Sequence, residues 1–161
     1  MLELEAEPPE PGLPIEARLG TFDPTVGAPD GIVFKKWEDE ETENPAPGAT
    51  EVWELYNFTA DAHPIHIHEV FFEVVNRQRI DKKTGVPIQT PVAPGPTENG
   101  RKDTVQAHPG QVTRIRARFE LPDEGTIELP PGVENPQYVW HCHILEHEEN
   151  DMMRAFEVEV A

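Results

Sequence analysis

Residues 63–68 read "HPIHIH", and this stretch has the alternation of a β-strand. Successive side chains of a strand point to opposite faces, so Ile65 and Ile67 would enter a core. His66 and His68 would then project together from the other face. Six positions therefore predict a strand with one apolar face and one imidazole face.

His63 stands apart from that pair. It precedes Pro64, which favours an extended backbone at His63, and we expect its ring to point away from those of His66 and His68. The stretch thus offers one separate imidazole and one pair on the same side.

The rest of the chain has the pattern of short strands joined by turns. It contains 18 prolines and 11 glycines, which are typical of turns, and no amphipathic helix of ten or more residues. Alternating or apolar segments predict strands at residues 32–37, 51–58, 65–75, 111–120, 137–142 and 152–160. A short helical turn is expected within residues 144–150. This pattern predicts an all-β fold, a Greek-key β-sandwich or barrel.

The second histidine-rich stretch is "HCHILEHEENDMM", residues 141–153, which holds the only cysteine of the chain. On a strand His141 and His143 share one face, and Cys142 takes the opposite one. The two histidine-rich stretches together hold six of the seven histidines. The concentration of imidazole and sulfur predicts a metal site.

His147 follows Cys142 by five residues and Met152 follows it by ten, so a tight loop would bring the three side chains together. Two histidines, one cysteine and a distant methionine are the ligands of blue copper sites. Zinc is the competing metal, but structural zinc sites use cysteines paired as C-x₂-C, and this chain has one cysteine.

A second copper site is expected on the opposite side of Cys142. The histidines on the outward faces of the two predicted strands are His66, His68, His141 and His143. The seventh histidine, His108, lies in the turn "QAHPGQ", and we expect it to be structural or exposed rather than a ligand.

Charge and composition narrow the possible partners. The chain has 161 residues and a net charge of −18, which argues against nucleic acid and anionic membranes as partners. No apolar run is long enough to span a membrane. Residues 1–18 are rich in Glu and Pro and predict a linker or arm, with one domain over residues 19–161. The first residues do not resemble a signal peptide. Signal peptides are removed from the precursors of exported proteins, so the localisation stays unknown and an extracytoplasmic one remains open.

The two motifs "HPIHIH" and "YVWHCHILEHEENDMM" resemble the copper motifs in the last cupredoxin domain of multicopper oxidases. The likeness is greatest to bacterial spore-coat laccases and bilirubin oxidases. The segments "TENPAPGATEVWELYNFT" and "GRKDTVQAHPGQVTRIRARF" also resemble that branch, so the resemblance covers about residues 19–160.

The resemblance implies a role for each ligand. The type 1 copper would be held by His63, Cys142 and His147, with Met152 as the axial ligand. His66 would face the type 2 copper, and the type 3 pair would use His68, His141 and His143. Glu148 matches an acidic position near the proton route to oxygen, which would make it the catalytic acid, and Met153 is expected to pack in the core.

The implied function is electron transfer through copper. Electrons would pass from a phenolic, pigment or metal-ion donor through the type 1 copper toward a histidine-bound site that reduces O₂. In the family that site uses eight histidines from two domains, and this chain offers four. Another cupredoxin domain or a second copy of this chain would therefore have to complete it. The alternatives are a blue-copper electron carrier without oxidase activity and a module whose assembly is mediated by metal.

Overall fold

The computed structural model describes residues 2–5, 14–120, 131 and 135–158. Within these residues the regular structure is almost all β, which confirms the predicted fold class. A four-stranded antiparallel sheet has the order β11-β10-β6-β8, and a three-stranded one has the order β5-β9-β7. The strands of the first are β6 (His63–Ile67), β8 (Thr104–Ala107), β10 (Gln137–Cys142) and β11 (Met153–Glu157). Those of the second are β5 (Thr50–Asn57), β7 (Phe72–Arg79) and β9 (Gln111–Arg118).

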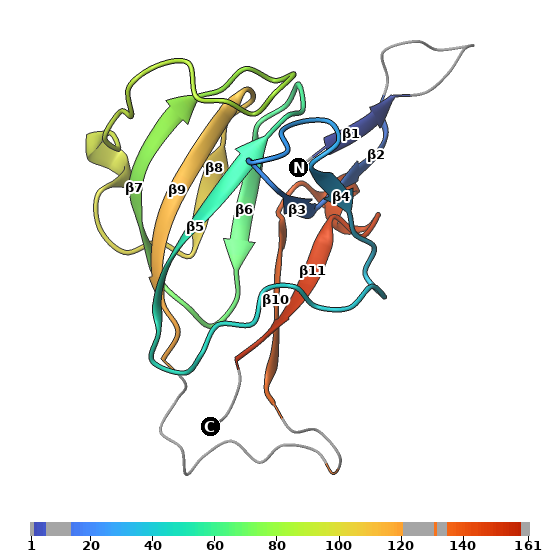
Figure 1. Ribbon diagram of the computed structural model, residues 1–161. Helices are drawn as coiled ribbons and strands as arrows, with labels where there is room; N and C mark the ends of the chain where they lie inside the picture. The colour runs from blue at the N-terminus through green and yellow to red at the C-terminus, as the bar shows by residue number, and fades with distance from the viewer. Residues whose placement is uncertain (1, 6–13, 121–130, 132–134, 159–161) are drawn as a thin grey trace.

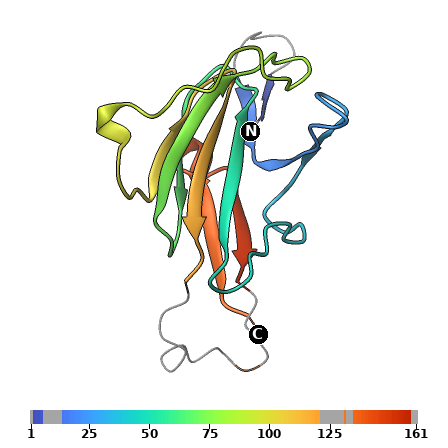
Figure 2. The ribbon, with the colours of Figure 1, turned by 60° about the vertical axis from the view of Figure 1, so that its left-hand side comes forward.

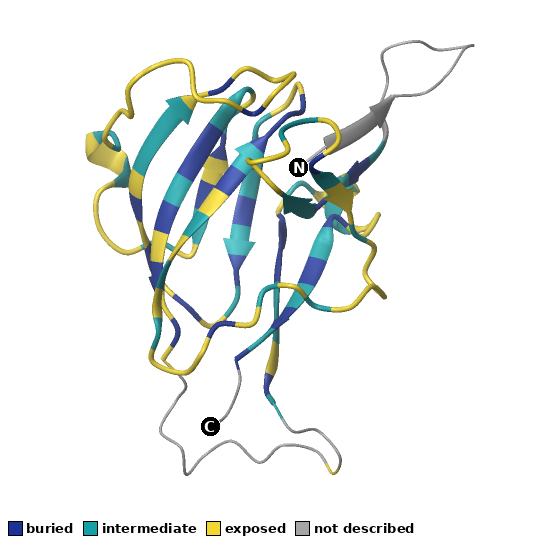
Figure 3. Ribbon diagram, in the orientation of Figure 1, coloured by how far each residue is buried: buried dark blue, intermediate teal, exposed yellow. Residues whose placement is uncertain are grey.

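The two sheets form the layers of a sandwich (Figure 1, Figure 2). Buried and exposed positions alternate along their strands, as Figure 3 shows for β5 and β9. The main core draws Ile65, Ile67 and Val105 from the four-stranded sheet and Phe72 and Ile115 from the three-stranded one. Because each sheet buries one face against the other, the outer face of β6 and β10 is left for polar side chains.

Strand β6 has the predicted alternation but not the predicted length. Ile65 and Ile67 are fully buried, and His66 and His68 are half-buried on the other side. The single strand expected over residues 65–75 is wrong, because β6 ends at Ile67 and β7 begins at Phe72 in the other sheet. The break falls at Glu69, whose φ of 64° lies in the left-handed region that interrupts a strand.

Strand β9 forms the centre of the three-stranded sheet and pairs with both β5 and β7. The predicted alternation places Ile115 and Ala117 in the core, and Arg116 and Arg118 are exposed. Val112 departs from this pattern, because it is buried in a second small cluster with Phe58 and Ile80.

Short strand pairs precede the sandwich. β1 (Leu2–Glu5) pairs with β2 (Pro14–Arg18), and β3 (Gly20–Phe22) pairs with β4 (Ile32–Phe34). The first pair lies within the segment predicted as a linker or arm, and the boundary between residues 18 and 19 stays a prediction. No helix within the described ranges is long and apolar enough to cross a membrane.

A buried arginine of β11 connects the segment after β4 to the sandwich through hydrogen bonds. Arg154 is 1% exposed, and its guanidinium donates to the backbone oxygens of Lys36, Asp39 and Glu40 at 2.9, 3.1 and 2.7 Å. These carbonyl groups offset the cost of burying the charge.

Candidate metal centres

The second histidine-rich stretch folds as a hairpin loop at one end of the sandwich. β10 pairs with β6, so that His141 lies opposite His66 and Cys142 opposite Ile65. After Cys142 the chain makes the short helix α1 (Leu145–Glu148) and returns as β11. The helical turn expected within residues 144–150 is thus confirmed.

Backbone hydrogen bonds close this loop. The N–H of Met152 donates to the carbonyl of His147 at 2.9 Å, and the N–H of Cys142 donates to the carbonyl of Met152 at 3.0 Å. These bonds hold the residues that lie five and ten positions after Cys142 beside it. The Cys142 sulfur and the His147 imidazole therefore come together because the loop is tight, and the backbone of Met152 lies beside both residues.

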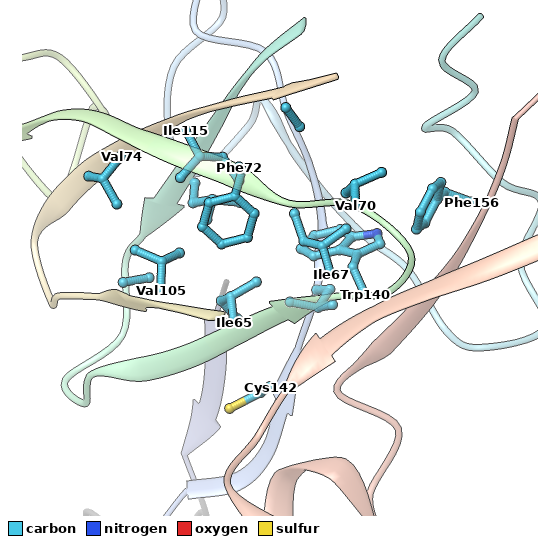
Figure 4. Close-up of a cluster of buried hydrophobic side chains, with 14 of the residues drawn as sticks. Ile65, Ile67, Val70, Phe72, Val74, Val105, Ile115, Trp140, Cys142 and Phe156 are labelled. Carbon is cyan, nitrogen blue, oxygen red and sulfur yellow. The ribbon is translucent and has the colours of Figure 1, made fainter. Parts of the chain in front are cut away.

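The three groups that we call the cysteine cluster are His63, Cys142 and His147. Their ligand atoms lie within 4.8 Å of one another. Nδ1 of His63 is 3.5 Å from Sγ of Cys142, and Nδ1 of His147 is 3.6 Å from the same sulfur. Figure 4 shows Cys142 at the edge of the apolar cluster that fills the sandwich. Two imidazole nitrogens thus face one sulfur in a setting closed to water on the His63 side.

The two methionines after this loop point in opposite directions. Met152 is fully buried in the same core cluster as Cys142. Met153 begins β11 and is only half-buried, opposite His141, so the expectation that it packs in the core is wrong. The reason is the alternation of the strand, which turns Met153 outward when Met152 faces inward.

Burial sets the charge of the cysteine cluster. His63 is fully buried, and this loss of water lowers the pKa of its ring to about 4, with a further lowering from the neighbouring His147. The ring is therefore neutral near pH 7 and has a lone pair for a metal ion. Burial raises the pKa of the Cys142 thiol, so binding of a metal there would displace its proton.

The histidine face consists of His66, His68, His141 and His143 on the outer side of β6 and β10. Their ring centroids lie 4.8 to 5.4 Å from their neighbours', and Nε2 of His68 is 3.3 Å from Nε2 of His141. His141 is buried and His143 is exposed, so the group reaches from the sheet to the surface. Burial and the neighbouring imidazoles lower the pKa of His68, which favours a neutral His68 ring that can bind metal.

Glu148 lies between the two histidines of "HCH". Its Oε2 is 3.5 Å from Nδ1 of His141 and 3.6 Å from Nδ1 of His143. The side chain is 34% exposed, so it connects this edge of the histidine face with solvent. His108 is half-buried in the turn before β9 and belongs to no candidate metal-binding group among the described residues.

Sequence reasoning missed two residues of the site, Asn57 and Thr59. Both are buried, and the hydroxyl of Thr59 lies 2.8 Å from Nε2 of His63. Asn57 ends β5 and Thr59 follows it, so no periodic pattern relates them to the histidine motif. The turn between β5 and β6 brings Thr59 to the ring, and Asn57 contacts Thr59.

The donor set fits copper. Neutral imidazoles together with one thiol and a buried thioether suit copper, and clustered imidazoles suit it as well. The fold and the two groups are therefore those of a copper protein of the cupredoxin class, a β-sandwich with candidate metal ligands on both sides of one strand pair.

Comparison with known proteins places the chain within that class. A family model described as multicopper oxidase matches residues 8–161. The chain is 44% identical over 130 residues to the laccase of Bacillus subtilis (strain 168), a match that spans 77% of this chain and 23% of the laccase. It is 46% identical over 128 residues to the laccase of Bacillus stratosphericus, covering 76% and 23%. This chain belongs to the multicopper oxidase family.

Solved structures agree on the fold. The McoA multicopper oxidase from Aquifex aeolicus matches with a TM-score of 0.59 and 28% identity over 80% of this chain and 26% of that one. A multicopper oxidase from Campylobacter jejuni, described as a metallo-oxidase, matches with a TM-score of 0.61 and 23% identity, over 80% and 23%. The chain thus spans about a quarter of the length of the relatives that it matches.

Proposed function

We propose that this chain passes single electrons from a donor through a type 1 copper toward a histidine-bound copper site. His63, Cys142 and His147 would hold the type 1 ion, and Met152 would be its axial ligand. The observation that carries the proposal is the approach of two Nδ1 atoms to one sulfur at 3.5 and 3.6 Å. Copper bound there supplies one-electron oxidation and reduction.

The cysteine cluster has one side suited to receive electrons. His63 is fully buried, but His147 is only half-buried and belongs to the exposed helix α1. Leu145, two residues earlier, is 67% exposed and offers an apolar contact. An organic donor such as a phenol or pigment would therefore approach the edge of the His147 ring, and a metal-ion donor would use the same edge.

The other side of the cluster leads to the histidine face. Cys142 is bonded through the backbone to His141 and His143, whose rings project from the opposite face of β10. A short covalent path therefore joins the sulfur to the outer imidazoles. On this face His66 would serve the type 2 copper, and His68, His141 and His143 would serve the type 3 pair.

Glu148 would move protons in this scheme. It is in contact with two ring nitrogens and partly exposed, so it can exchange a proton with solvent and hold it at the Nδ1 edge of His141 or His143. Reduction of O₂ consumes protons as well as electrons, and we assign Glu148 to their supply.

Reduction of O₂ would require a second set of histidines. The face presents four imidazoles, and two copies of the chain, or this domain and another cupredoxin domain, would bring 4 + 4 = 8. The relatives are about four times as long as their match to this chain, which favours further domains of one enzyme as the partner.

The proposal is tested by the visible spectrum of the copper-loaded protein. We expect an intense blue absorption that the Cys142→Ser variant loses while circular dichroism shows an intact β-fold. His108→Ala is the matched control, because it removes a histidine outside both groups, and it should keep the colour. Blue absorption that survives Cys142→Ser would refute the thiolate assignment.

A second function is favoured by one observation. The cysteine cluster is complete within one chain, whereas His143 on the histidine face has a side chain 52% exposed. A blue-copper electron carrier without oxidase activity needs only the cysteine cluster. Oxygen uptake with a phenolic donor separates the two functions, and a metal-dependent increase in mass would instead support an assembly module.

A further inference from the structure

The imidazole ring of His63 has a partner at each nitrogen. Nδ1 lies 3.5 Å from Sγ of Cys142, and Nε2 lies 2.8 Å from Oγ1 of Thr59. Thr59 is 4% exposed and His63 is 0% exposed, so bulk water does not compete for these positions. The hydrogen bond at Nε2 therefore decides which nitrogen carries the proton of the neutral ring.

Asn57 fixes the orientation of the Thr59 hydroxyl. Its Nδ2 donates to the carbonyl oxygens of Asp61 and Ala107 at 2.7 and 2.8 Å. Carbonyl oxygens only accept, so the amide has one possible orientation and Oδ1 faces Thr59. This Oδ1 accepts from the N–H of Thr59 at 2.8 Å and from its hydroxyl at 2.7 Å.

The count of protons then settles the tautomer. A hydroxyl has one proton to donate. Oδ1 of Asn57 at 2.7 Å and the carbonyl oxygen of Asp61 at 3.0 Å can only accept, so these two short contacts direct the hydroxyl proton to one of these oxygens and away from the ring. The hydroxyl therefore accepts from the ring, which leaves the hydrogen on Nε2 of His63 and the lone pair of Nδ1 directed at Cys142.

We infer that Thr59, oriented by Asn57, is a positioning residue that sets the tautomer of His63 before any metal binds. The inference rests on the proposed function only in taking Nδ1 as the atom that meets copper. Metal-binding histidines commonly donate their second nitrogen to a neighbour, and loss of such a neighbour costs about 10- to 100-fold in metal affinity. Here that neighbour is a hydroxyl held by a second buried side chain.

His66, on the same strand as His63, has the opposite tautomer. Nδ1 of His66 lies 2.9 Å from the backbone oxygen of Asp103, which can only accept, so Nδ1 carries the hydrogen. The lone pair of His66 is then on Nε2. β6 thus directs Nδ1 of His63 to the cysteine cluster and keeps Nε2 of His66 for the histidine face.

The test is nitrogen NMR of the imidazole rings in the metal-free protein, which distinguishes protonated from unprotonated ring nitrogens. In the wild type we expect the Nε2–H tautomer at His63 and the Nδ1–H tautomer at His66. Thr59→Val, which removes the hydroxyl and keeps the shape, should abolish the preference at His63 and leave His66 unchanged. Thr59→Ser should restore it.

Cu(I) affinity, measured by competition with a chromophoric chelator, should fall about 10- to 100-fold in Thr59→Val and recover in Thr59→Ser. Thr113→Val is the matched control, because Thr113 is also fully buried but its Oγ1 has no hydrogen-bond partner in the part of the chain that the structure describes. This control should keep both the tautomer and the affinity.

Three results would overturn the inference. They are the Nδ1–H tautomer at His63 in the wild type, an unchanged tautomer in Thr59→Val, and an equal effect of Thr113→Val. The first of these needs no variant and so does not depend on whether Thr59→Val folds. The NMR experiment contains no metal, so a negative result there concerns the tautomer alone. Failure of the proposed copper function would be seen separately, as the absence of a blue band in the copper-loaded wild type.

Discussion

At the scale of single residues, burial has opposite effects on two groups of the cysteine cluster: it favours metal binding at His63 and opposes it at Cys142. Burial keeps the His63 ring neutral, with a pKa of about 4, and thereby makes its lone pair available. The same burial raises the pKa of Cys142 and keeps the thiol protonated without metal. Copper must therefore displace one proton, from the sulfur rather than from the ring, when it binds.

Met152 and Met153 give a test of the axial ligand. Met152→Leu keeps the volume of a fully buried side chain and removes its sulfur, so we expect the fold to persist. Without the thioether the site favours Cu(I), and the reduction potential should rise by about 60 mV for each tenfold change in relative affinity. Redox titration of the blue absorption measures the shift.

Met153→Leu is the control for this experiment, since it makes the same chemical change on the outward side of β11. Its reduction potential should match the wild type. A potential that moves equally in both variants, or only in Met153→Leu, would contradict the assignment of Met152 as the axial ligand.

Alternation along a strand predicts much of the site at this scale. It separates Cys142 from His141 and His143, and Ile65 and Ile67 from His66 and His68, because side-chain direction in a strand depends only on parity. It could not identify Thr59, which reaches the His63 ring from the turn between β5 and β6, or Asn57, which contacts Thr59 and not the ring. The misplacement of Met153 came from ignoring the same parity rule that the histidines obey.

At the scale of elements, the sequence predicts most strands but not where the chain changes sheet. Residues 65–75 are largely apolar or alternating, and nothing in that pattern marks the left-handed Glu69 at which the chain leaves β6. β8 is four residues long and follows a long loop, so its strand character comes from pairing with β6 rather than from its own pattern. Such short strands are stabilised by their neighbours in the sheet.

The loop that contains Glu98 is joined to β7 by an ion pair that should depend on pH. Arg77 donates from Nη1 and Nη2 to the two carboxylate oxygens of Glu98, each at 2.6 Å. This hydrogen bonding lowers the pKa of Glu98 below its ordinary value. The folded state therefore binds the proton less readily than the unfolded state, and the stabilisation is present above the unfolded pKa and lost as pH falls through the folded one.

Glu98→Gln should accordingly lower the free energy of unfolding by about 1 kcal/mol at pH 7, and the difference from the wild type should vanish in acid. Urea denaturation at a series of pH values measures it. Glu120→Gln is the control, because the Arg118–Glu120 pair is 62% and 63% exposed and should contribute almost nothing. A Glu98→Gln deficit that persisted unchanged at low pH would contradict the linkage.

At the scale of the whole molecule, the seven histidines divide between two candidate metal groups and one turn. Two belong to the cysteine cluster, four form the histidine face, and His108 lies apart. The cysteine cluster is closed to water on the His63 side and complete within the chain, while the histidine face reaches the surface and is completed from outside in our proposal. Binding of copper to the two groups should therefore respond differently to association.

We expect a monomer to bind one copper per chain tightly, with blue colour, and not to reduce O₂ to water. Further copper ions should bind tightly only when a partner domain or a second copy faces the four imidazoles. If the partner is another copy, this binding should be accompanied by a doubling of mass. Copper analysis, sedimentation and oxygen uptake on the same sample measure the three quantities. One copper per chain in a persistent monomer would remove the proposal of a homo-oligomer.

Two variants separate the groups in this experiment. The double variant His66→Ala and His143→Ala alters the histidine face alone, so it should keep the blue band and lose any copper-dependent association. Cys142→Ser should do the reverse, because the outer imidazoles do not need the sulfur to bind metal. A monomer that bound several coppers and reduced O₂ to water would contradict the division, since it would show that four imidazoles on one face are enough.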